Sequence, residues 1–241
     1  MENIFNLVIR IINRVLRPLR YRVVSISMAQ LLLEALARKG SGVKFIQVGA
    51  NDGVRFDGLY PIVTSMRWSG LVIEPLPSAF LRLAANYQDH KNVIPLNIAL
   101  HPSADTAVLY FVPNDRLFAY PDYVAGTPSF NRDHVIRYGV NPDDISHTDV
   151  KCMPLMDIVN SYHLEDADYL QIDTEGFDAE IIKMIDFRTF KPTAVKFEWV
   201  NLSPREQEET MELLIKNDYN VEVSKDRHDC VAWLSHKIKA E

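Results

Sequence analysis

The sequence predicts an α/β fold of the Rossmann-like type, with a seven-stranded, mostly parallel sheet and an antiparallel C-terminal hairpin. Three observations support this prediction. Short apolar runs rich in β-branched residues alternate with segments of helical periodicity, a pattern typical of buried parallel strands joined by crossover helices. A glycine-rich turn follows the first run. The last two runs are close enough in sequence to pair antiparallel.

The elements follow from these runs in order. Five strands are expected to be parallel, at 43–48, 70–74, 93–100, 169–173 and 194–199, and two antiparallel, at 220–223 and 230–234. Helices are expected at 58–66, 77–87, 177–185 and 204–217. Pro61 is compatible with the first of these helices only because it falls in the first turn.

Length and composition favour one catalytic domain preceded by helices. A chain of 241 residues with 47% hydrophobic residues can bury one sizeable core. We expect N-terminal helices over 1–40 and the main domain over 41–241. Within the main domain, 101–154 breaks the alternation and contains several prolines, so we expect an insertion that closes over the carboxyl ends of the strands. Its edges, at 107–112 and 149–153, are predicted to be strands.

The first 22 residues form a basic amphipathic segment. Apolar residues recur at helical spacing, and five arginines against one glutamate give a formal charge of +4. Arginines at every turn argue against a transmembrane span, and the pattern is not that of a cleaved signal. We expect this helix to pack on the catalytic body or on a second subunit, as in a homodimer, with peripheral contact to an anionic membrane surface as the alternative.

Charge and cysteine content restrict the partners and the location. A net charge of -6 argues against nucleic acid as a partner, because nucleic-acid-binding domains carry a basic face. Cys152 and Cys230 are far apart and predict neither a zinc site nor a disulfide framework. A cytoplasmic location is expected, with the inner membrane surface as an option for residues 1–22.

A glycine turn ends the first strand. Gly49 and Gly53 supply the conformational freedom and the missing side chains that let a ligand press against backbone. The spacing differs from the G-x-G-x-x-G fingerprint, which counts against a nicotinamide dinucleotide as the ligand. A purely structural turn is the alternative.

The ends of the second and third strands predict an adenosine site. Glu74, which is followed by Pro75, lies about 20 residues beyond the turn, where a carboxylate can accept both hydroxyls of a ribose. Asn97 is placed to meet an adenine edge while Ile98 and Ala99 pack on its face. A solvated carboxylate and core packing are the alternatives for these positions.

The fourth strand predicts the reactive edge. It delivers Asp173 to the carboxyl end of the sheet, and Glu175 is close enough for repulsion to raise one pKa. Such a carboxylate could accept the proton of a hydroxyl nucleophile or hold an ammonium group. Helix capping by Asp173 or Thr174 is the alternative. Mg²⁺ bound to Asp173, Glu175 and Asp178 is a further option, but no metal is expected.

The insertion supplies weaker candidates. His134 is a third choice as general base, although an isolated histidine is more often structural. Tyr120, Tyr123 and Phe130 could stack on a sugar ring or pack the insertion onto the domain.

Several motifs together resemble the FkbM-type methyltransferases. They are VGANDG (48–53), DGLYP (57–61), W-SGLVIEP (68–75), PSAFLRLAANY (77–87), NIAL (97–100), YLQIDTEGFDAEII (169–182) and KFEWV (196–200). The resemblance covers residues 45–201. It implies a class I fold that binds S-adenosylmethionine (SAM) and methylates a hydroxyl of a sugar, glycan, glycolipid or polyketide. Gln171 departs from the pattern, because the family often has lysine there.

Residue by residue, the resemblance implies a binding site and a reaction edge. Carried over by position, Gly49, Asn51 and Gly53 would line the methionyl part of SAM, Glu74 would hold the ribose, and Asp173 with Glu175 would form the reaction edge. With the neighbours inferred from the turn and the strand ends, the expected cofactor-binding residues are Gly49, Ala50, Asn51, Asp52, Gly53, Glu74, Pro75, Asn97, Ile98, Ala99 and Asp173. Methyl transfer is an in-line displacement, so its rate depends mainly on holding the acceptor oxygen about 3 Å from the methyl carbon, with Asp173 or Glu175 as base. A noncatalytic adenosine-binding protein and a nicotinamide-dependent oxidoreductase are the alternatives.

Overall fold

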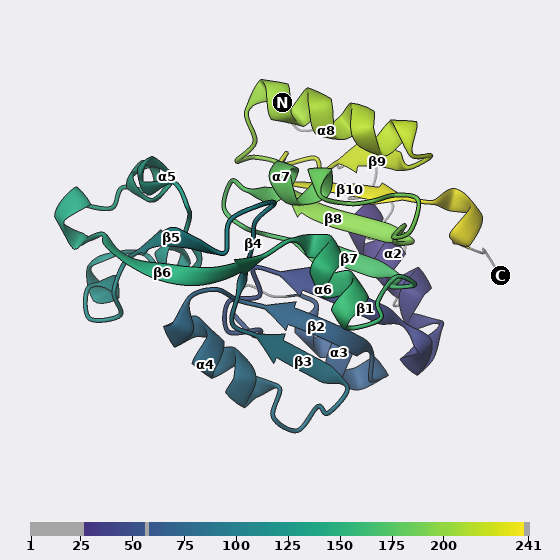
Figure 1. Cartoon of the computed structure of the whole chain (residues 1–241), viewed down its shortest axis with the longest axis horizontal. Helices are drawn as coiled ribbons and strands as arrows, with labels where there is room; N and C mark the ends of the chain where they lie inside the picture. Colours follow the sequence, from purple (N-terminus) through teal and green to yellow (C-terminus); the bar gives the residue numbers. More distant parts are fainter. Residues whose placement is uncertain (1–26, 56–57, 239–241) are drawn as a thin grey trace, which may run out of the picture.

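The main sheet has seven strands in the order β3-β2-β1-β7-β8-β10-β9 (Figure 1). The computed structural model describes residues 27–55 and 58–238, so the helix predicted over 1–22 lies outside the described residues. The strands are β1 Lys44–Val48, β2 Ser69–Ile73, β3 Val93–Leu96, β7 Tyr169–Ile172, β8 Ala194–Glu198, β9 Asn220–Val223 and β10 Asp229–Trp233. The first five strands of this sheet along the chain pair in parallel.

The C-terminal hairpin gives the sheet its antiparallel end. β10 pairs antiparallel with both β8 and β9. The last strand of the chain therefore lies between the two strands that precede it. The prediction of a seven-stranded, mostly parallel sheet with an antiparallel C-terminal hairpin is confirmed.

Two apolar cores cover the two faces of the sheet, because strand side chains alternate. Phe45 packs on one face with residues of α2 and α3, whereas Ile46 packs on the other with residues of α6, α7 and α8. The helices are α2 Met28–Ala37, α3 Tyr60–Met66, α4 Pro77–Asn86, α6 Leu155–Ser161, α7 Asp178–Lys183 and α8 Pro204–Lys216. None of the helices in the described part is long and apolar enough to cross a membrane.

The predicted third strand, 93–100, is wrong as one continuous element. β3 ends at Leu96, and β4 (Ala99–Leu100) pairs instead with β6 (Ser146–Met153) in a second sheet. The break occurs at Asn97, whose side-chain amide donates to the carbonyls of Glu74 (2.9 Å) and Pro75 (3.0 Å). Side-chain hydrogen bonds to the neighbouring loop thus replace the strand ladder at this point.

Two strands of the second sheet and the segment between them form a lid beside the main sheet, on the left of Figure 1. Its order is β4-β6-β5, with β5 at Thr106–Phe111. The tip of the lid, between β5 and β6, contains short 3₁₀ turns and one helix, α5 (Arg132–Arg137). We use the word lid for residues 101–154, and tip for residues 112–145.

Helix ends differ from the sequence prediction by one or two residues, and two short helices were missed, α5 in the lid and α6 after it. α6 follows the lid directly, and its buried residues Leu155, Ile158 and Val159 join the core. Seven residues are too few for the apolar period to stand out. α7 begins at Asp178, one residue later than predicted, because Thr174 is held in the preceding turn by the Asp178 carboxylate.

Candidate active site

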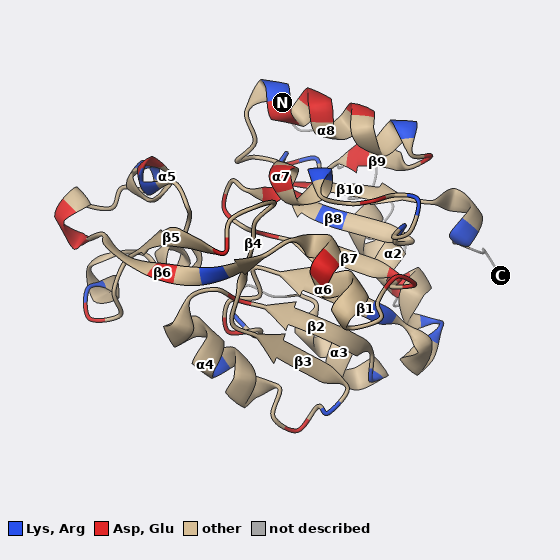
Figure 2. Ribbon diagram, in the orientation of Figure 1, with Lys and Arg blue, Asp and Glu red and all other residues tan. Residues whose placement is uncertain are grey.

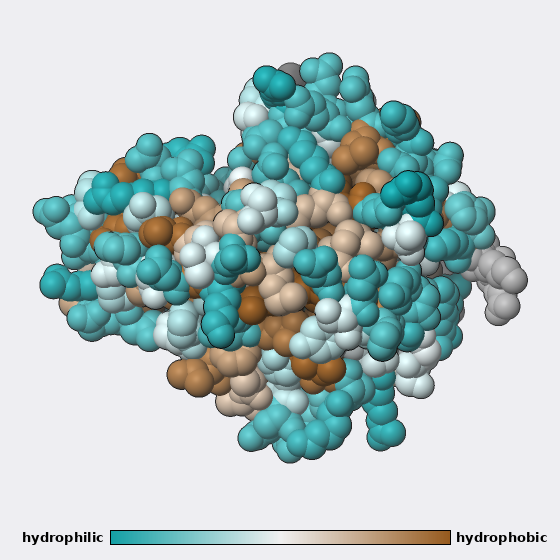
Figure 3. Space-filling view, viewed as in Figure 1, coloured by the Kyte–Doolittle hydropathy of each residue, from teal (hydrophilic) through white to brown (hydrophobic). Residues whose placement is uncertain are grey.

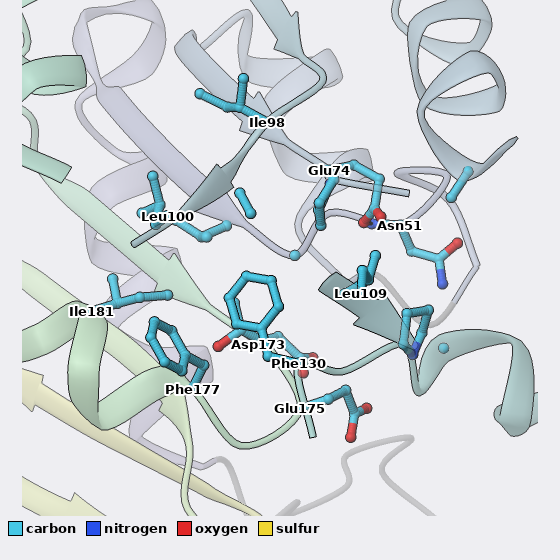
Figure 4. Close-up of a pocket in the computed structure, with 18 residues that line it drawn as sticks. Asn51, Glu74, Ile98, Leu100, Leu109, Phe130, Asp173, Glu175, Phe177 and Ile181 are labelled. Carbon is cyan, nitrogen blue, oxygen red and sulfur yellow. Dashed lines mark hydrogen bonds between the residues drawn. The ribbon is translucent and has the colours of Figure 1, made fainter. Parts of the chain in front are cut away.

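A pocket of about 610 Å³ lies between the carboxyl ends of the parallel strands and the lid (Figure 4). It is lined by Val48, Gly49, Asn51, Glu74, Pro75, Ala79, Ile98, Ala99, Leu100, Leu109, Gly126, Pro128, Phe130, Asp173, Thr174, Glu175, Phe177 and Ile181. The mixture of apolar walls with a few polar groups is typical of a small-molecule site. The pocket lies where parallel α/β sheets bind ligands, beyond the carboxyl ends of the strands.

The glycine turn after β1 brings two strands close together. Gly49 has φ +78°, and a Cβ at this position would lie 1.7 Å from the carbonyl oxygen of Asp173. A side chain therefore cannot be accommodated here unless β1 and β7 separate. Asn51 also has a positive φ, +48°, and its side-chain amide donates to the lid carbonyl of Ala125 at 3.3 Å. The turn thus contacts both the backbone of Asp173, which follows β7, and the lid.

Glu74 ends β2 as a buried carboxylate with a fixed orientation. Its Oε2 accepts from the backbone N–H of Asn51 and its Oε1 from that of Leu76, both at 2.8 Å. Burial raises the pKa of Glu74 to about 7, although both N–H donors oppose the shift. Each carboxylate oxygen has a further lone pair. Two vicinal hydroxyls can therefore be accepted without breaking either backbone hydrogen bond.

Seven of the eleven predicted cofactor-binding residues line the pocket: Gly49, Asn51, Glu74, Pro75, Ile98, Ala99 and Asp173. The other four support it from behind. Ala50 is buried in the core, and Gly53 packs against Leu83 and Tyr87. Asp52 accepts from the backbone N–H groups of Val54 and Arg55 and shapes the turn.

Asn97 is the fourth predicted residue outside the lining. Its amide nitrogen donates to the two carbonyls named above, so it fixes the loop after Glu74. Ile98, Leu100 and Leu109 supply apolar surface on this side of the pocket, and the last of them comes from the lid. A flat aromatic base has apolar contacts available here.

Asp173 faces the pocket from the end of β7. Its side chain is partly open to the pocket, but surrounding protein desolvates the carboxylate, and the charges of Asp178 and Glu175 add to this. Together they raise the pKa of Asp173 well above its usual value. Lys196, which is paired in register with Gln171, lowers the pKa but does not offset the rise. A lysine on the adjacent strand thus supplies a positive charge beside Gln171.

Glu175 is held in an unusual conformation by the lid. It has φ +53°, a region that non-glycine residues occupy only when the surroundings enforce it. Its carbonyl accepts from Ser129 Oγ at 2.8 Å. Its Oε2 accepts from His134 Nε2 at 2.8 Å and from Tyr138 Oη at 3.2 Å.

Two functional candidates, Glu198 at the end of β8 and Asn201 in the loop after it, were missed from the sequence. Asn201 Nδ2 donates to Glu175 Oε2 at 3.1 Å and to Glu198 Oε2 at 2.7 Å. Burial, followed by the charges of Glu175 and Asp173, raises the pKa of Glu198 to about 9. Both residues lie within or beside the quoted KFEWV motif, but only the tertiary fold brings them to Glu175.

The carboxylates of Asp173, Glu175 and Glu198 have oxygen atoms within 4.8 Å of one another. In Figure 2, acidic residues gather in the loops between the lid and α7. Asp178, which the sequence offered as a Mg²⁺ ligand, is instead fully buried and bonded to Thr174 and to the backbone N–H of Glu198. The expectation that no metal takes part stays a prediction.

His134 does not reach the pocket. It is 1% exposed, and both ring nitrogens are engaged: Nε2 with Glu175 and Nδ1 with Arg137 at 3.0 Å. A base needs a free lone pair directed at the substrate. The geometry therefore argues against His134 as the base and places it behind Glu175.

Of the three predicted stacking residues, only Phe130 lines the pocket. Its ring packs edge-on against Phe177 with ring centroids 5.1 Å apart. Tyr120 donates to Asp144 within the lid, and Tyr123 packs against Tyr138. Both tyrosines therefore hold the tip together, as the alternative interpretation expected.

The strand order and the position of the pocket are those of a Rossmann-like α/β fold with a ligand site at the carboxyl ends of its strands. The chain belongs to the FkbM methyltransferase family, because the model described as the Methyltransferase FkbM domain matches residues 47–221. This match covers the glycine turn and both acidic strand ends, and it favours methyl transfer over the nicotinamide-dependent alternative. Comparison with curated proteins gives no match.

Solved structures share the fold at low sequence identity. The crystal structure of Methyltransferase FkbM from Methylobacillus flagellatus KT has 15% identity and a TM-score of 0.50, over 80% of this chain and 44% of that chain. This chain thus spans less than half of that structure. Precorrin-6y C5,15-methyltransferase from Geobacter metallireducens GS-15 has 14% identity and a TM-score of 0.41, over 85% of this chain and 86% of that chain.

Proposed function

We propose that this methyltransferase uses SAM to methylate a hydroxyl group of a sugar, glycan, glycolipid or related small acceptor. One observation carries the proposal: Glu74 and Asp173, from different strands, both face one pocket beneath the lid. Glu74 can accept the two ribose hydroxyls, and the apolar residues near Ile98 can pack on the adenine. SAM supplies an activated methyl group when it is bound.

Asp173 and Glu175, which both follow β7, are suited to different roles in the proposed reaction. Asp173 has a raised pKa and is therefore a stronger base than an ordinary aspartate. Glu175 Oε2 already accepts three hydrogen bonds from His134, Tyr138 and Asn201, so donors from the protein occupy this oxygen. We therefore assign proton removal from the acceptor hydroxyl to Asp173, and not to Glu175 or His134.

The lining also supports a polyol acceptor. Phe130 and Phe177 offer aromatic surface beside carboxylates that can accept hydrogen bonds from hydroxyl groups. The acidic surroundings disfavour an acceptor with a negative charge close to the reacting hydroxyl. We propose neutral glycans as the first class to test, in a cytoplasmic setting.

The first test measures methyl transfer from SAM with a labelled methyl group to neutral, amino and acidic glycosides. We expect Asp173→Asn to lower kcat by about 100-fold or more, because positioned bases contribute roughly that much. Asp89→Asn is the matched control, since it removes an exposed carboxylate in the turn after α4. Unchanged turnover in Asp173→Asn would remove the assignment of the base. Tight SAM binding with no transfer to any acceptor would favour the noncatalytic alternative.

A further inference from the structure

The tip of the lid is joined to the main domain at Glu175 by a cluster of hydrogen bonds. Ser129, His134 and Tyr138 all donate to this one residue, from positions spread over ten residues of the tip. A fourth contact, from Asn51 to the carbonyl of Ala125, joins the tip to the glycine turn. Asn201 adds a donor from the loop after β8.

Arg137 fixes which proton His134 carries. A guanidinium group only donates hydrogen bonds, so Nδ1 of His134 must accept from Arg137 Nη2. The remaining proton is then on Nε2, which lies 2.8 Å from Glu175 Oε2 and donates to it. Arg137 and His134 are three residues apart at the end of α5, so one short helix positions both side chains for the hydrogen bonds that lead to Glu175.

The same segment closes one side of the pocket. Gly126, Pro128 and Phe130 line the pocket, and they lie between the contact with Asn51 and the contacts with Glu175. In Figure 4, Glu175 lies at the margin of the pocket, whereas Asp173 lies nearer its centre beside Phe130. Release of Glu175 would therefore loosen this segment from the main domain on one side, while Asn51 still contacts Ala125 and the backbone of Ser129 stays paired with that of Tyr110 on β5.

We propose that Glu175 is a latch that holds the tip of the lid closed over the pocket, and that His134 and Tyr138 are positioning residues that act through it. Hydrogen bonds to a charged partner are stronger than those between neutral groups. The left-handed backbone of Glu175 also persists only while its neighbours enforce it. The latch rests on the proposed function only where cofactor exchange is concerned.

The test compares His134→Ala with His134→Gln. Glutamine can donate from its amide nitrogen close to the position of His134 Nε2, but it cannot act as a base. Hydrogen–deuterium exchange on the ligand-free protein should be about tenfold or more faster over 125–138 in His134→Ala. It should stay within about threefold of the wild type in His134→Gln. SAM should likewise dissociate faster from His134→Ala than from His134→Gln, and its dissociation from His134→Gln should be close to that from the wild type.

Arg132→Met is the matched control, because Arg132 is on the same helix but donates to the carbonyl of Pro142, away from Glu175. In this variant, hydrogen–deuterium exchange over 125–138 should proceed at the wild-type rate. Tyr138→Phe removes one latch contact without altering His134, so it tests the latch even if His134→Ala fails to fold, and it should accelerate exchange over 125–138.

Two results would overturn the latch: wild-type exchange in His134→Ala and Tyr138→Phe, or equal acceleration in both His134 variants. Loss of methyl transfer in His134→Gln with normal exchange would restore His134 as a catalytic residue and also overturn the positioning role. If SAM binds to none of the proteins, the proposed function fails, while the exchange data still decide on the latch.

Discussion

Glu74 and Asp173 are both carboxylates at the ends of strands, yet their surroundings suit different tasks. Glu74 is 6% exposed, and two backbone N–H groups fix its orientation. Asp173 is open to the pocket and lies among other acids. The first arrangement suits binding by a fixed acceptor, and the second suits exchange of a proton with a ligand.

We predict that SAM affinity increases as the pH rises from 5.5 to 7.5. The pKa of Glu74 in the free protein is raised to about 7, and the ribose hydroxyls require the ionised carboxylate. Below pH 7 a proton must leave before binding, so the affinity should fall by up to about tenfold for each further pH unit. Titration calorimetry in two buffers of different ionisation enthalpy would show this proton release.

Glu74→Gln is the control for this pH dependence, because it keeps any titration that belongs to the ligand. The variant should bind SAM more weakly and with little dependence on pH in the same range. A wild-type affinity that is flat from pH 5.5 to 7.5 would contradict the assignment of Glu74 to the ribose.

At this scale, the sequence predicts residues that follow strands and misses residues that only the fold brings together. Glu74 and Asp173 were found because parallel strands end at one edge of a sheet. Glu198, Asn201 and Tyr138 gather around Glu175 from distant segments, and no local pattern marks them. His134 was found as a candidate, but its task depends on Arg137 and Glu175 and could not be read from its position.

At the scale of elements, the contact between β1 and β7 is the most restrictive one in the site. Gly49 is hydrogen-bonded through its N–H to Ile73 on β2, while its Cα faces the carbonyl of Asp173 on β7. Three strands that carry pocket residues therefore meet at one glycine. Its left-handed backbone and its lack of a side chain are both required.

We predict that Gly49→Ala destabilises the protein by about 3 kcal/mol or more, because it combines overpacking with an unfavourable φ. The free energy of unfolding in urea measures this. Gly42→Ala is the matched control, since a Cβ there has no atom within 4 Å and the backbone is not left-handed. Equal stability of the two variants would contradict the rigid contact described above.

The strands and helices were mostly predictable because the buried parallel strands are short apolar runs and most helices have a clear apolar period of 3.6 residues. The division between β3 and β4 was not, because 93–100 reads as one continuous apolar run. What divides it is the tertiary contact of Asn97 with the loop after Glu74. The short helix α6 gives too small a pattern to be recognised.

At the scale of the whole molecule, β3 is an edge strand of the sheet that residues 27–55 and 58–238 form, and this edge is poorly suited to pairing with another strand. Asn92 and Leu96 accept from β2, which directs Pro95 toward the free edge, where its missing N–H costs no ladder bond. The N–H of Val93 is taken by the carbonyl of His90. Apolar side chains gather on this part of the surface in Figure 3, including Leu81 and Ile94, so a blunt edge limits aggregation.

We predict that residues 1–26 do not anchor the protein to anionic vesicles. The basic segment continues into Ser27, which borders a groove lined by three acidic residues, Glu222, Asp226 and Asp229, and one basic residue, Lys225. The net negative charge of this lining favours packing on the chain itself or on a second copy. Sedimentation with phosphatidylserine vesicles should give equal partitioning for the full chain and for residues 27–241. Partitioning that depends on residues 1–26 would favour the membrane alternative.

The lid is fastened at its base more firmly than at its tip. The lid begins directly after β4, the short strand that follows Ile98. It ends with β6, which pairs with β4 and leads directly into the buried helix α6. Insertions, deletions or exchanged loops between residues 112 and 145 would therefore leave Glu74, Ile98 and the strand ends in place. We expect chimeras that borrow this stretch from other family members to keep the proposed ribose contact at Glu74 while they change the wall formed by Gly126, Pro128 and Phe130.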